Sequence, residues 1–406
     1  MNRMATTRTG TRSFDVAERQ ARIGVRHHLA AAQHTDDVVR ITDDLVGLHS
    51  TDPVSVYLSA AARMKHPSFE PLATALYEDR ALVRHHAMRR TLWVFSPEVA
   101  RLAHASTTTG LLKQQRKVLR ELLEATGVVD DPDAWVDQAR ADTLAALHRL
   151  GPTTARRLGK EVPALGVKLQ LAVGKPYGAE VAAHTRVLLL MGFEGQIVRT
   201  KPAGTWINGE YNWTAADTWI EGGLTNPSTG PDPADAAAEL VGRWLLSFGP
   251  ATTADLQWWT GWSGGATKAA LARAGAIEVE LDGSPGWIAV GDDKRVAAQK
   301  PWVALLPALD PTTMGWKQRD WYLPAEHASV LFDRNGNGGP TVWVDGQIVG
   351  GWVQRPSGEI AIRLVSDVGA EQQAAIDREA DVLRGLLGDT RFRCRFPAPL
   401  QAELLR

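Results

Sequence analysis

The distribution of apolar and polar positions predicts one order of elements that recurs along the chain. Apolar residues spaced by three or four positions indicate amphipathic helices, and short β-branched or aromatic runs indicate strands. In the first occurrence, a helix that Thr35 can cap is followed by helices over 53–64 and 69–79. Strand-like runs at 82–84 and 91–95 then complete a group of three helices and a two-stranded ribbon.

A segment that occurs twice supports this grouping. Residues 149–159 read Arg-Leu-Gly-Pro-Thr-Thr-Ala-Arg-Arg-Leu-Gly, and residues 247–257 read Ser-Phe-Gly-Pro-Ala-Thr-Thr-Ala-Asp-Leu-Gln. Each copy follows an apolar helical stretch and offers a Gly-Pro turn with a threonine suited to cap the next helix. Helix, turn, capped short helix, second helix and β-ribbon is the order of a winged helix-turn-helix, so two copies indicate an array of DNA-binding modules.

The pattern changes after residue 300. Short strands are expected from residue 303 onward, including one at 329–331 and a last one near Phe392, with a helix over 369–387. Val344-Asp-Gly-Gln347 is typical of a β-hairpin, because Asp-Gly suits a type I′ turn.

The predicted fold class is therefore α+β, with three tandem winged helix-turn-helix modules in a C-shaped array and a carboxy-terminal β-rich domain. In the second module the late helix is expected at 181–193. The predicted segments are a basic, flexible tail with a helix at 15–33 (1–34), winged helix 1 (35–96), a helical linker (97–132), winged helix 2 with a β-hairpin (133–220), winged helix 3 (232–291) and the β-rich domain (301–406).

Composition narrows the class of protein. No apolar run approaches the roughly 18 residues of a membrane span, and the first 14 residues lack the apolar core of a secretory signal. The single cysteine, Cys394, excludes an intramolecular disulfide and fits a reducing cytoplasm. A cytoplasmic monomer, nucleoid-associated when bound to DNA, is the expectation.

The net charge of −1 hides an asymmetry. Residues 1–120 hold 18 Lys and Arg against 11 Asp and Glu, so this third of the chain is basic and the remainder is acidic. With the helix-turn-helix pattern, this indicates a local surface for nucleic acid, although ordinary surface variation is the alternative.

In this arrangement the chain resembles the AlkZ/YcaQ-type winged-helix DNA glycosylases, which remove bulky N7-alkylguanine adducts and unhook interstrand cross-links. The resemblance covers most of the chain. It rests on motifs in the family's order, namely Leu48-His-Ser-Thr-Asp-Pro53 with Tyr57-Leu58, Met88-Arg-Arg-Thr-Leu92, Arg199-Thr-Lys-Pro-Ala-Gly-Thr-Trp206 with Tyr211, Phe248-Gly-Pro250 to Asp255 with Trp258-Trp259-Thr260, Leu306-Pro-Ala-Leu-Asp-Pro311, and Pro340-Thr-Val-Trp-Val-Asp-Gly346 through Val349-Gly350.

The resemblance implies a catalytic motif of two polar residues around a variable one, usually Gln-x-Gln or Gln-x-Asp. Its positions correspond to His49 and Thr51, followed by Asp52-Pro53. Histidine occurs at the first position in some members, whereas threonine departs from the family pattern. In this hypothesis neutral His49 accepts a proton from water or orients it, Thr51 adds a hydrogen bond, and Asp52 offsets developing positive charge.

Each of these residues also has a structural interpretation. Asp52 before Pro53 is a standard helix start, with a carboxylate cap and proline in the first turn. Thr51 is equally compatible with a plain turn residue, and His49 with a histidine that is satisfied inside the fold.

Candidate DNA contacts are basic and aromatic residues on the predicted wings and helix starts. Packing of the hairpin is the alternative for Trp206 and Tyr211, and solvation is the alternative for the arginines. The set is Arg89, Arg90, Arg156, Arg157, Arg199, Lys201, Trp206, Asn208, Tyr211 and Lys268.

The expected function is a monofunctional DNA glycosylase that acts on double-stranded DNA with bulky alkylated or cross-linked bases. No nucleotide-binding or metal-binding motif is found in the sequence, so no cofactor and no metal are expected. A DNA-binding protein without catalysis, such as a regulator or a lesion-shielding paralogue, is the main alternative. A weaker third interpretation is sequestration of a small genotoxic molecule in an aromatic pocket, given the 15 tryptophans.

Overall fold

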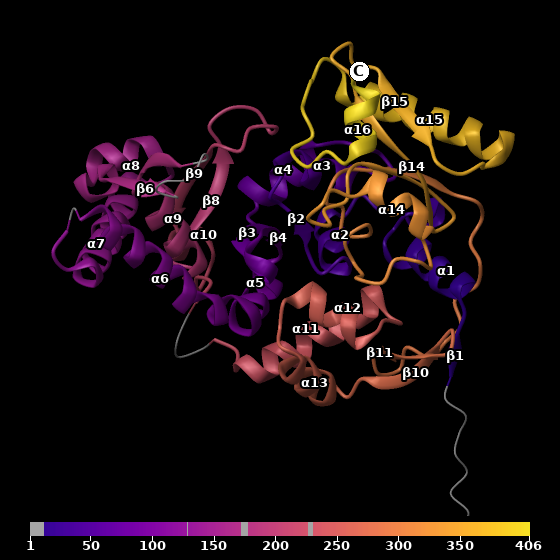
Figure 1. Ribbon diagram of the computed structural model, residues 1–406, viewed down its shortest axis with the longest axis horizontal. Coiled ribbons are helices and arrows are strands. Elements are labelled where there is room, and N and C mark those ends of the chain that lie inside the picture. The colour runs from indigo at the N-terminus through magenta and orange to yellow at the C-terminus, as the bar shows by residue number, and fades with distance from the viewer. Residues whose placement is uncertain (1–11, 128, 172–177, 226–229) are drawn as a thin grey trace, which may run out of the picture.

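The structure is a computed structural model that describes residues 12–127, 129–171, 178–225 and 230–406 (Figure 1). The predicted flexible tail falls almost entirely on residues 1–11, outside the described part. The short strand β1 (Ser13–Phe14), which no pattern indicated, pairs in parallel with β10 (Ile277–Leu281).

The first group of elements follows the predicted order. Three of its helices begin at side-chain caps, where Asp15, Asp37 and Asp52 each accept a backbone N–H hydrogen bond. The cap of the second helix is thus Asp37, and the prediction of Thr35 at this position is wrong. The predicted helix over 15–33 is too long, because His28 takes a left-handed conformation (φ 53°) that no helix continues. The elements are α1 (Val16–Arg26), α2 (Val38–Asp44), β2 (Leu48–His49), α3 (Pro53–Ala61), α4 (Glu70–Tyr77), β3 (Val83–His86) and β4 (Leu92–Phe95).

The second group follows the helical segment formed by α5 (Pro97–Ala103) and α6 (Thr109–Thr126), and it repeats this order with one added pair of strands, at 168–171 and 179–182, between its second and third helices. The prediction of a helix from residue 181 is wrong at its start, because residues 179–182 form a strand paired with Lys168–Leu171. The elements are α7 (Pro132–Leu150), β5 (Thr153–Thr154), α8 (Ala155–Glu161), β6 (Lys168–Leu171), β7 (Ala179–Ala182), α9 (His184–Phe193), β8 (Ile197–Pro202), β9 (Tyr211–Ala215) and α10 (Ala216–Trp219).

The third group confirms that the repeated segment forms the same local structure twice. Thr154 caps α8, and Thr252 caps α12 in a reciprocal arrangement with Asp255. The elements are α11 (Pro233–Phe248), α12 (Thr253–Thr260), α13 (Gly264–Arg273), β10 and β11 (Ser284–Ile288).

The carboxy-terminal part is a four-stranded antiparallel sheet of order β12-β13-β14-β15 with helices around it. Two predicted strands are wrong. Residues 329–331 form the last turn of α14. Phe392 lies in a segment without regular structure, where its backbone N–H donates to the side chain of Gln354 and not to the backbone of a neighbouring strand. The elements are β12 (Val303–Leu306), α14 (Ala325–Leu331), β13 (Thr341–Val344), β14 (Gln347–Gln354), β15 (Ile360–Leu364), α15 (Gly369–Leu387) and α16 (Pro399–Leu404).

One six-stranded sheet of order β2-β4-β3-β8-β9-β5 joins the first two groups. Each group contributes three strands, and the junction is the antiparallel pairing of Arg84 in β3 with Arg199 in β8. The order within one half mirrors the other, so the short strands β2 and β5 stand at opposite edges. The lobe that holds α7, α8 and α9 projects from this sheet (Figure 1).

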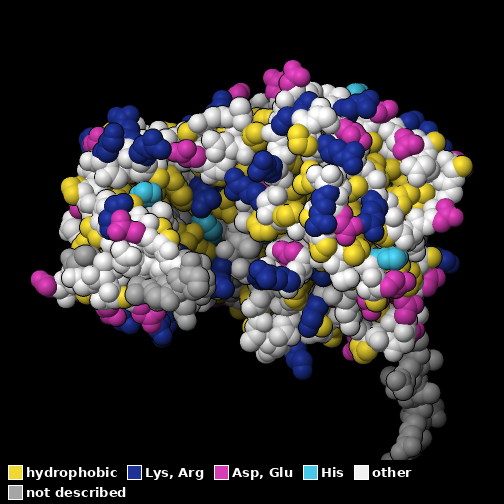
Figure 2. Space-filling view, turned by 45° about the horizontal axis from the view of Figure 1, so that its top comes forward, with side chains coloured by type: hydrophobic (Ala, Val, Ile, Leu, Met, Phe, Trp, Pro, Cys, Tyr) yellow, Lys and Arg dark blue, Asp and Glu magenta, His cyan; other side chains and the backbone are white. Residues whose placement is uncertain are grey.

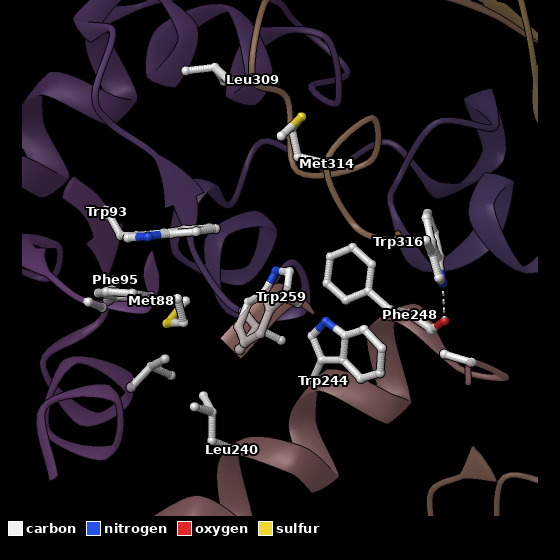
Figure 3. Close-up of a cluster of buried hydrophobic side chains, with 14 of the residues drawn as sticks. Met88, Trp93, Phe95, Leu240, Trp244, Phe248, Trp259, Leu309, Met314 and Trp316 are labelled. Carbon is white, nitrogen blue, oxygen red and sulfur yellow. Dashed lines mark hydrogen bonds between the residues drawn. The ribbon is translucent and has the colours of Figure 1, made fainter. Parts of the chain in front are cut away.

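The largest apolar core connects the first group, the third group and the carboxy-terminal part (Figure 3). Trp259 of α12 packs edge-on against Trp93 of β4 and at a tilt against Trp244 of α11, with ring centroids 5.8 Å and 6.0 Å apart. Trp316 adds a hydrogen bond to the carbonyl oxygen of Phe248 at 3.0 Å. Burial of aromatic rings stabilises such cores strongly, so β4 is held firmly where it supports β2.

Candidate active site

His49 lies on the edge strand β2, where it pairs with Trp93 of β4. The side chain is 5% exposed, and its ring packs against the Trp93 ring at 5.0 Å. Its Nδ1 atom is buried and has no hydrogen-bond partner among the described residues. Burial, and then the charge of Arg89, lower the pKa of His49 to about 3, so the imidazole is neutral at physiological pH.

Thr51 and Asp52 follow in the turn between β2 and α3. The hydroxyl of Thr51 is buried and, within the described part of the chain, unpartnered. Asp52 is the amino-terminal cap of α3 and accepts from Val54 N at 3.1 Å, as its structural interpretation predicts. Burial raises the pKa of the Asp52 carboxyl, and the backbone N–H of Arg395 also donates to it at 3.3 Å.

Sequence reasoning missed Arg84, which supports the variable residue of the motif. Its Nε donates to Ser50 Oγ at 3.2 Å and its Nη1 donates to Tyr77 OH at 2.9 Å. Although the residue is only 2% exposed, no carboxylate of the described residues pairs with it, and Nη2 has no partner. An arginine at the end of the predicted strand 82–84, directly after Leu82 and Val83, was the available signal, since charged residues are rarely fully buried.

Arg199 and Tyr211 meet Arg84 at the junction of the sheet. The Arg84 guanidinium lies 4.6 Å from the Tyr211 ring centroid, and that of Arg199 lies 4.8 Å from the Trp213 ring. Burial lowers the pKa of Arg199 to about 10, and its Nε and the Tyr211 hydroxyl are buried without partners among the described residues. Arg84 and Arg199 are paired across β3 and β8, and like charges in such a position repel each other. The two guanidinium groups together form a concentrated positive region at the junction of the sheet.

Arg89 forms a second basic group on the other side of the motif. Its guanidinium lies 4.1 Å above the Trp258 ring, and that of Arg319 lies 5.3 Å from the same ring. Burial, and then the charge of Arg319, lower the pKa of Arg89 to about 10. Arg90 is exposed beside it. Trp258 is half-buried beneath these two arginines, whereas its neighbour Trp259 is buried in the largest core.

The tip of the β8–β9 hairpin reaches the first group of elements. Trp206 packs on Phe69 and Tyr57, with ring centroids 4.4 Å and 5.1 Å apart, which matches its packing interpretation. Asn208 accepts from Glu210 N within the turn, and Lys201 is exposed. Contact of these residues with DNA stays a prediction.

The structure does not bring all candidate DNA contacts together. Arg156 and Arg157 are exposed on α8 at the far end of the projecting lobe, and Lys268 is exposed on α13 at the opposite side of the molecule (Figure 1). The residues around β2 and α3 are therefore a separate set.

Unpartnered buried polar atoms concentrate around this set. Those in or next to this set belong to His49, Thr51, Arg84, Arg199, Tyr211, Arg89 and Arg319, and the remaining ones among the described residues belong to Arg19, Asp43, His85, Arg120, Trp244 and Ser247. Such groups cost free energy unless a ligand or water satisfies them. Figure 2 shows a hollow between the projecting lobe and the rest of the molecule, with Lys and Arg side chains along it.

No group of three or more possible metal ligands occurs among the residues that the structure describes. None of the helices in the same ranges is long and apolar enough to cross a membrane.

Comparison with known proteins places the chain in a family. The model of the family "DNA glycosylase AlkZ-like" matches residues 42–385. The solved structure of Streptomyces sahachiroi DNA glycosylase AlkZ is similar to this fold, with a TM-score of 0.71 and 21% sequence identity over 95% of this chain and 99% of that one. No curated protein sequence matches the chain. The family match covers well over half of the sequence, and the chain thus belongs to the AlkZ-like DNA glycosylase family.

Proposed function

We propose that this protein is a monofunctional glycosylase that hydrolyses the N-glycosidic bond of bulky N7-alkylated guanine, or unhooks interstrand cross-links, in double-stranded DNA. Family membership supports DNA glycosylase activity in base repair. The unpartnered, neutral His49 beside the unpartnered hydroxyl of Thr51, in a basic and partly buried setting, supports the site.

The three groups of elements support winged-helix modules. Each has a helix, a short strand or bridge, two helices and an antiparallel pair of strands, which is the order of a winged helix-turn-helix. We place these three modules at residues 35–96, 133–220 and 232–291. In the monomer that we propose, they surround duplex DNA.

The chemistry follows from the leaving group. N7 alkylation makes the guanine cationic, so its departure needs little acid catalysis, whereas the oxocarbenium-like sugar needs a placed water. A neutral imidazole can accept a hydrogen bond from that water through Nδ1, and Thr51 can add a second bond. Asp52 places negative charge nearby. Residues 48–53 hold no lysine for a Schiff base, so the proposal is hydrolysis without strand cleavage.

The test is base release from a duplex with one N7-alkylguanine. Wild-type protein should release the base and leave an abasic site that breaks only after alkaline treatment. Direct strand breakage would contradict the monofunctional mechanism, and retention of the base would contradict catalysis.

A non-catalytic DNA-binding protein is the second candidate, and two observations favour it. Thr51 stands where the family pattern has Gln or Asp, and His49 is only 5% exposed. Binding to the lesion-containing duplex without base release, unaffected by changes at His49 and Thr51, would establish this candidate.

A further inference from the structure

The carboxy-terminal segment 388–398, here named the strap, crosses from α15 to α16 beside the candidate active site. The family match ends at residue 385, so it does not extend to the strap. The side chains of the strap alternate, with Arg391, Arg393 and Arg395 exposed between residues that are partly buried.

The apolar side chains hold the strap in place. Phe392 packs with the core of the carboxy-terminal sheet, and Phe396 packs against the largest core. Gln354 of β14 fixes the beginning of the strap, because its amide donates to the carbonyl oxygen of Thr390 at 2.9 Å and accepts from Phe392 N at 3.2 Å. The strap is therefore an ordered element that presents arginines.

Arg395 connects the strap to the motif and to the hairpin. Its backbone N–H donates to Asp52 Oδ2 at 3.3 Å, and its Nε lies 4.0 Å from Asp52 Oδ1. A Cβ on Gly209 would lie 2.6 Å from Arg395 Nη2, so the glycine permits this close approach to the β8–β9 turn. The Arg395 side chain nevertheless stays 48% exposed.

Arg391 has a different role. Its guanidinium donates to the carbonyl oxygens of Gly388 and Thr390 within the strap and to those of Pro356 and Ser357 in the β14–β15 turn. These bonds occupy the guanidinium of Arg391. Of the three exposed arginines of the strap, Arg393 and Arg395 therefore remain for a ligand.

We propose that Arg393 and Arg395 bind two backbone phosphates of duplex DNA next to the base that His49 would receive. Exposed and partly buried side chains alternate over residues 391–395, as in an extended chain, in which residues two apart lie about 7 Å apart on the same side. Each guanidinium can therefore reach a separate phosphate. Arginine suits phosphate because its planar fork donates two parallel hydrogen bonds. That these phosphates lie next to the target base rests on the proposed function. The contact between the two arginines and DNA requires no catalysis.

The test is binding of an undamaged duplex at increasing salt concentration, measured by fluorescence anisotropy. Each lost phosphate contact should reduce the slope of log Kd against log salt by about 0.9. The double variant Arg393→Gln/Arg395→Gln should therefore lower the slope by about 2 and weaken binding several-fold at low salt.

Two controls make the result specific. The double variant Arg393→Lys/Arg395→Lys keeps both charges and should retain the wild-type slope. Arg378→Gln removes an exposed arginine on α15, and it should also leave the slope unchanged. Unchanged melting temperatures would show that all variants are folded.

The outcomes separate the two proposals. Tight wild-type binding with a double glutamine variant that behaves like Arg378→Gln overturns the strap contact alone. Absence of wild-type binding overturns the strap contact and the proposed function together. A reduced slope without any base excision supports the strap contact and contradicts only catalysis.

Discussion

At the scale of single residues, the site is notable for polar groups that the fold leaves unsatisfied. A buried donor or acceptor without a partner costs about 1–3 kcal/mol. Several such groups surround His49, and within the described residues no carboxylate pairs with the buried Arg84 or the half-buried Arg199 opposite it. Phosphates and a placed water would supply the missing partners, so this cost is consistent with a DNA-binding enzyme.

The neutrality of His49 leads to a prediction about pH. Because burial lowers its pKa to about 3, its protonation state does not change between pH 8 and pH 5.5. The rate of base release should therefore show no inflection near pH 6.5. Single-turnover rates on one lesion-containing duplex, measured where circular dichroism shows folded protein, would check this. A rate that falls with a midpoint near 6.5 would mean that His49 is solvated and titrates normally.

Arg84 should be needed for function more than for stability. Replacing it by Met removes a buried charge, which is often neutral or favourable, but also removes the hydrogen bonds to Ser50 and Tyr77. We expect Arg84→Met to change the free energy of unfolding by no more than about 1 kcal/mol and to slow excision at least about tenfold.

Urea unfolding and single-turnover kinetics on the same preparation would measure both effects of Arg84→Met. Lys113→Met, on the exposed surface of α6, is the matched control. If Arg84→Met lowered the free energy of unfolding by several kcal/mol while its folded fraction excised the base at the wild-type rate, Arg84 would be a purely structural residue.

At the scale of elements, one buried ion pair joins α3 to the carboxy-terminal part. Arg63, just after α3, bonds both oxygens of Asp310 at 2.9 Å and 2.8 Å, and both side chains are fully buried. Arg63 also donates to the carbonyl oxygen of His27. Asp310 belongs to the segment Leu306–Pro311, which is one of the segments that resemble the family. This segment thus fixes α3, the helix that begins directly after His49–Asp52.

Breaking this pair should destabilise the protein strongly. Asp310→Ala leaves the Arg63 guanidinium buried without its counter-ion, which typically costs about 3–5 kcal/mol. Chemical unfolding of Asp310→Ala beside Asp381→Ala, which removes an exposed pair with Arg384, measures the difference. Asp381→Ala should cost less than about 1 kcal/mol. Equal effects of the two changes would refute the role of the buried pair.

Local patterns predicted most elements because helix caps and apolar spacing are local properties. Asp52-Pro53 correctly predicted the start of α3, and residues 369–387 correctly predicted α15. The failures occur where distant contacts override the local pattern. Residues 179–182 form a strand because they pair with β6, and the strap keeps its place without forming a helix or strand because Gln354 of a distant strand bonds its backbone.

At the scale of the whole molecule, the site exists only where four parts of the chain meet. The motif comes from the first group, Arg199 from the second, Trp258 from the third, and Arg319 and Arg395 from the carboxy-terminal part. The sequence indicated the motif but not these neighbours, because long-range pairing such as that of β3 with β8 has no local signature. Basic residues on α8 and α13 fitted the local pattern, yet the fold places them elsewhere.

Acid should destabilise the whole fold. Burial lowers the pKa values of His27, His85 and His86 well below 6.5 and that of His104 to about 4. Below pH 6.5 these histidines bind protons in the unfolded chain but stay neutral in the native state. The free energy of unfolding therefore falls as pH decreases from 6.5 toward 4. Each such histidine contributes up to about 1.4 kcal/mol per pH unit.

Urea midpoints at pH 7.5, 6.0 and 5.0 would measure this loss of stability. They should decrease steadily below pH 6.5. Constant midpoints across this range would show that these histidines are not neutral and buried.

The role of His49 is tested most directly by base release from an N7-alkylguanine duplex by wild type, His49→Ala and His66→Ala, with binding to the same duplex measured in parallel. His66 is an exposed histidine outside the site and serves as the matched control. We predict that wild type and His66→Ala release the base, whereas His49→Ala loses at least about 100-fold in rate and binds within a few-fold of wild type. Excision by His49→Ala at the wild-type rate would contradict the central claim.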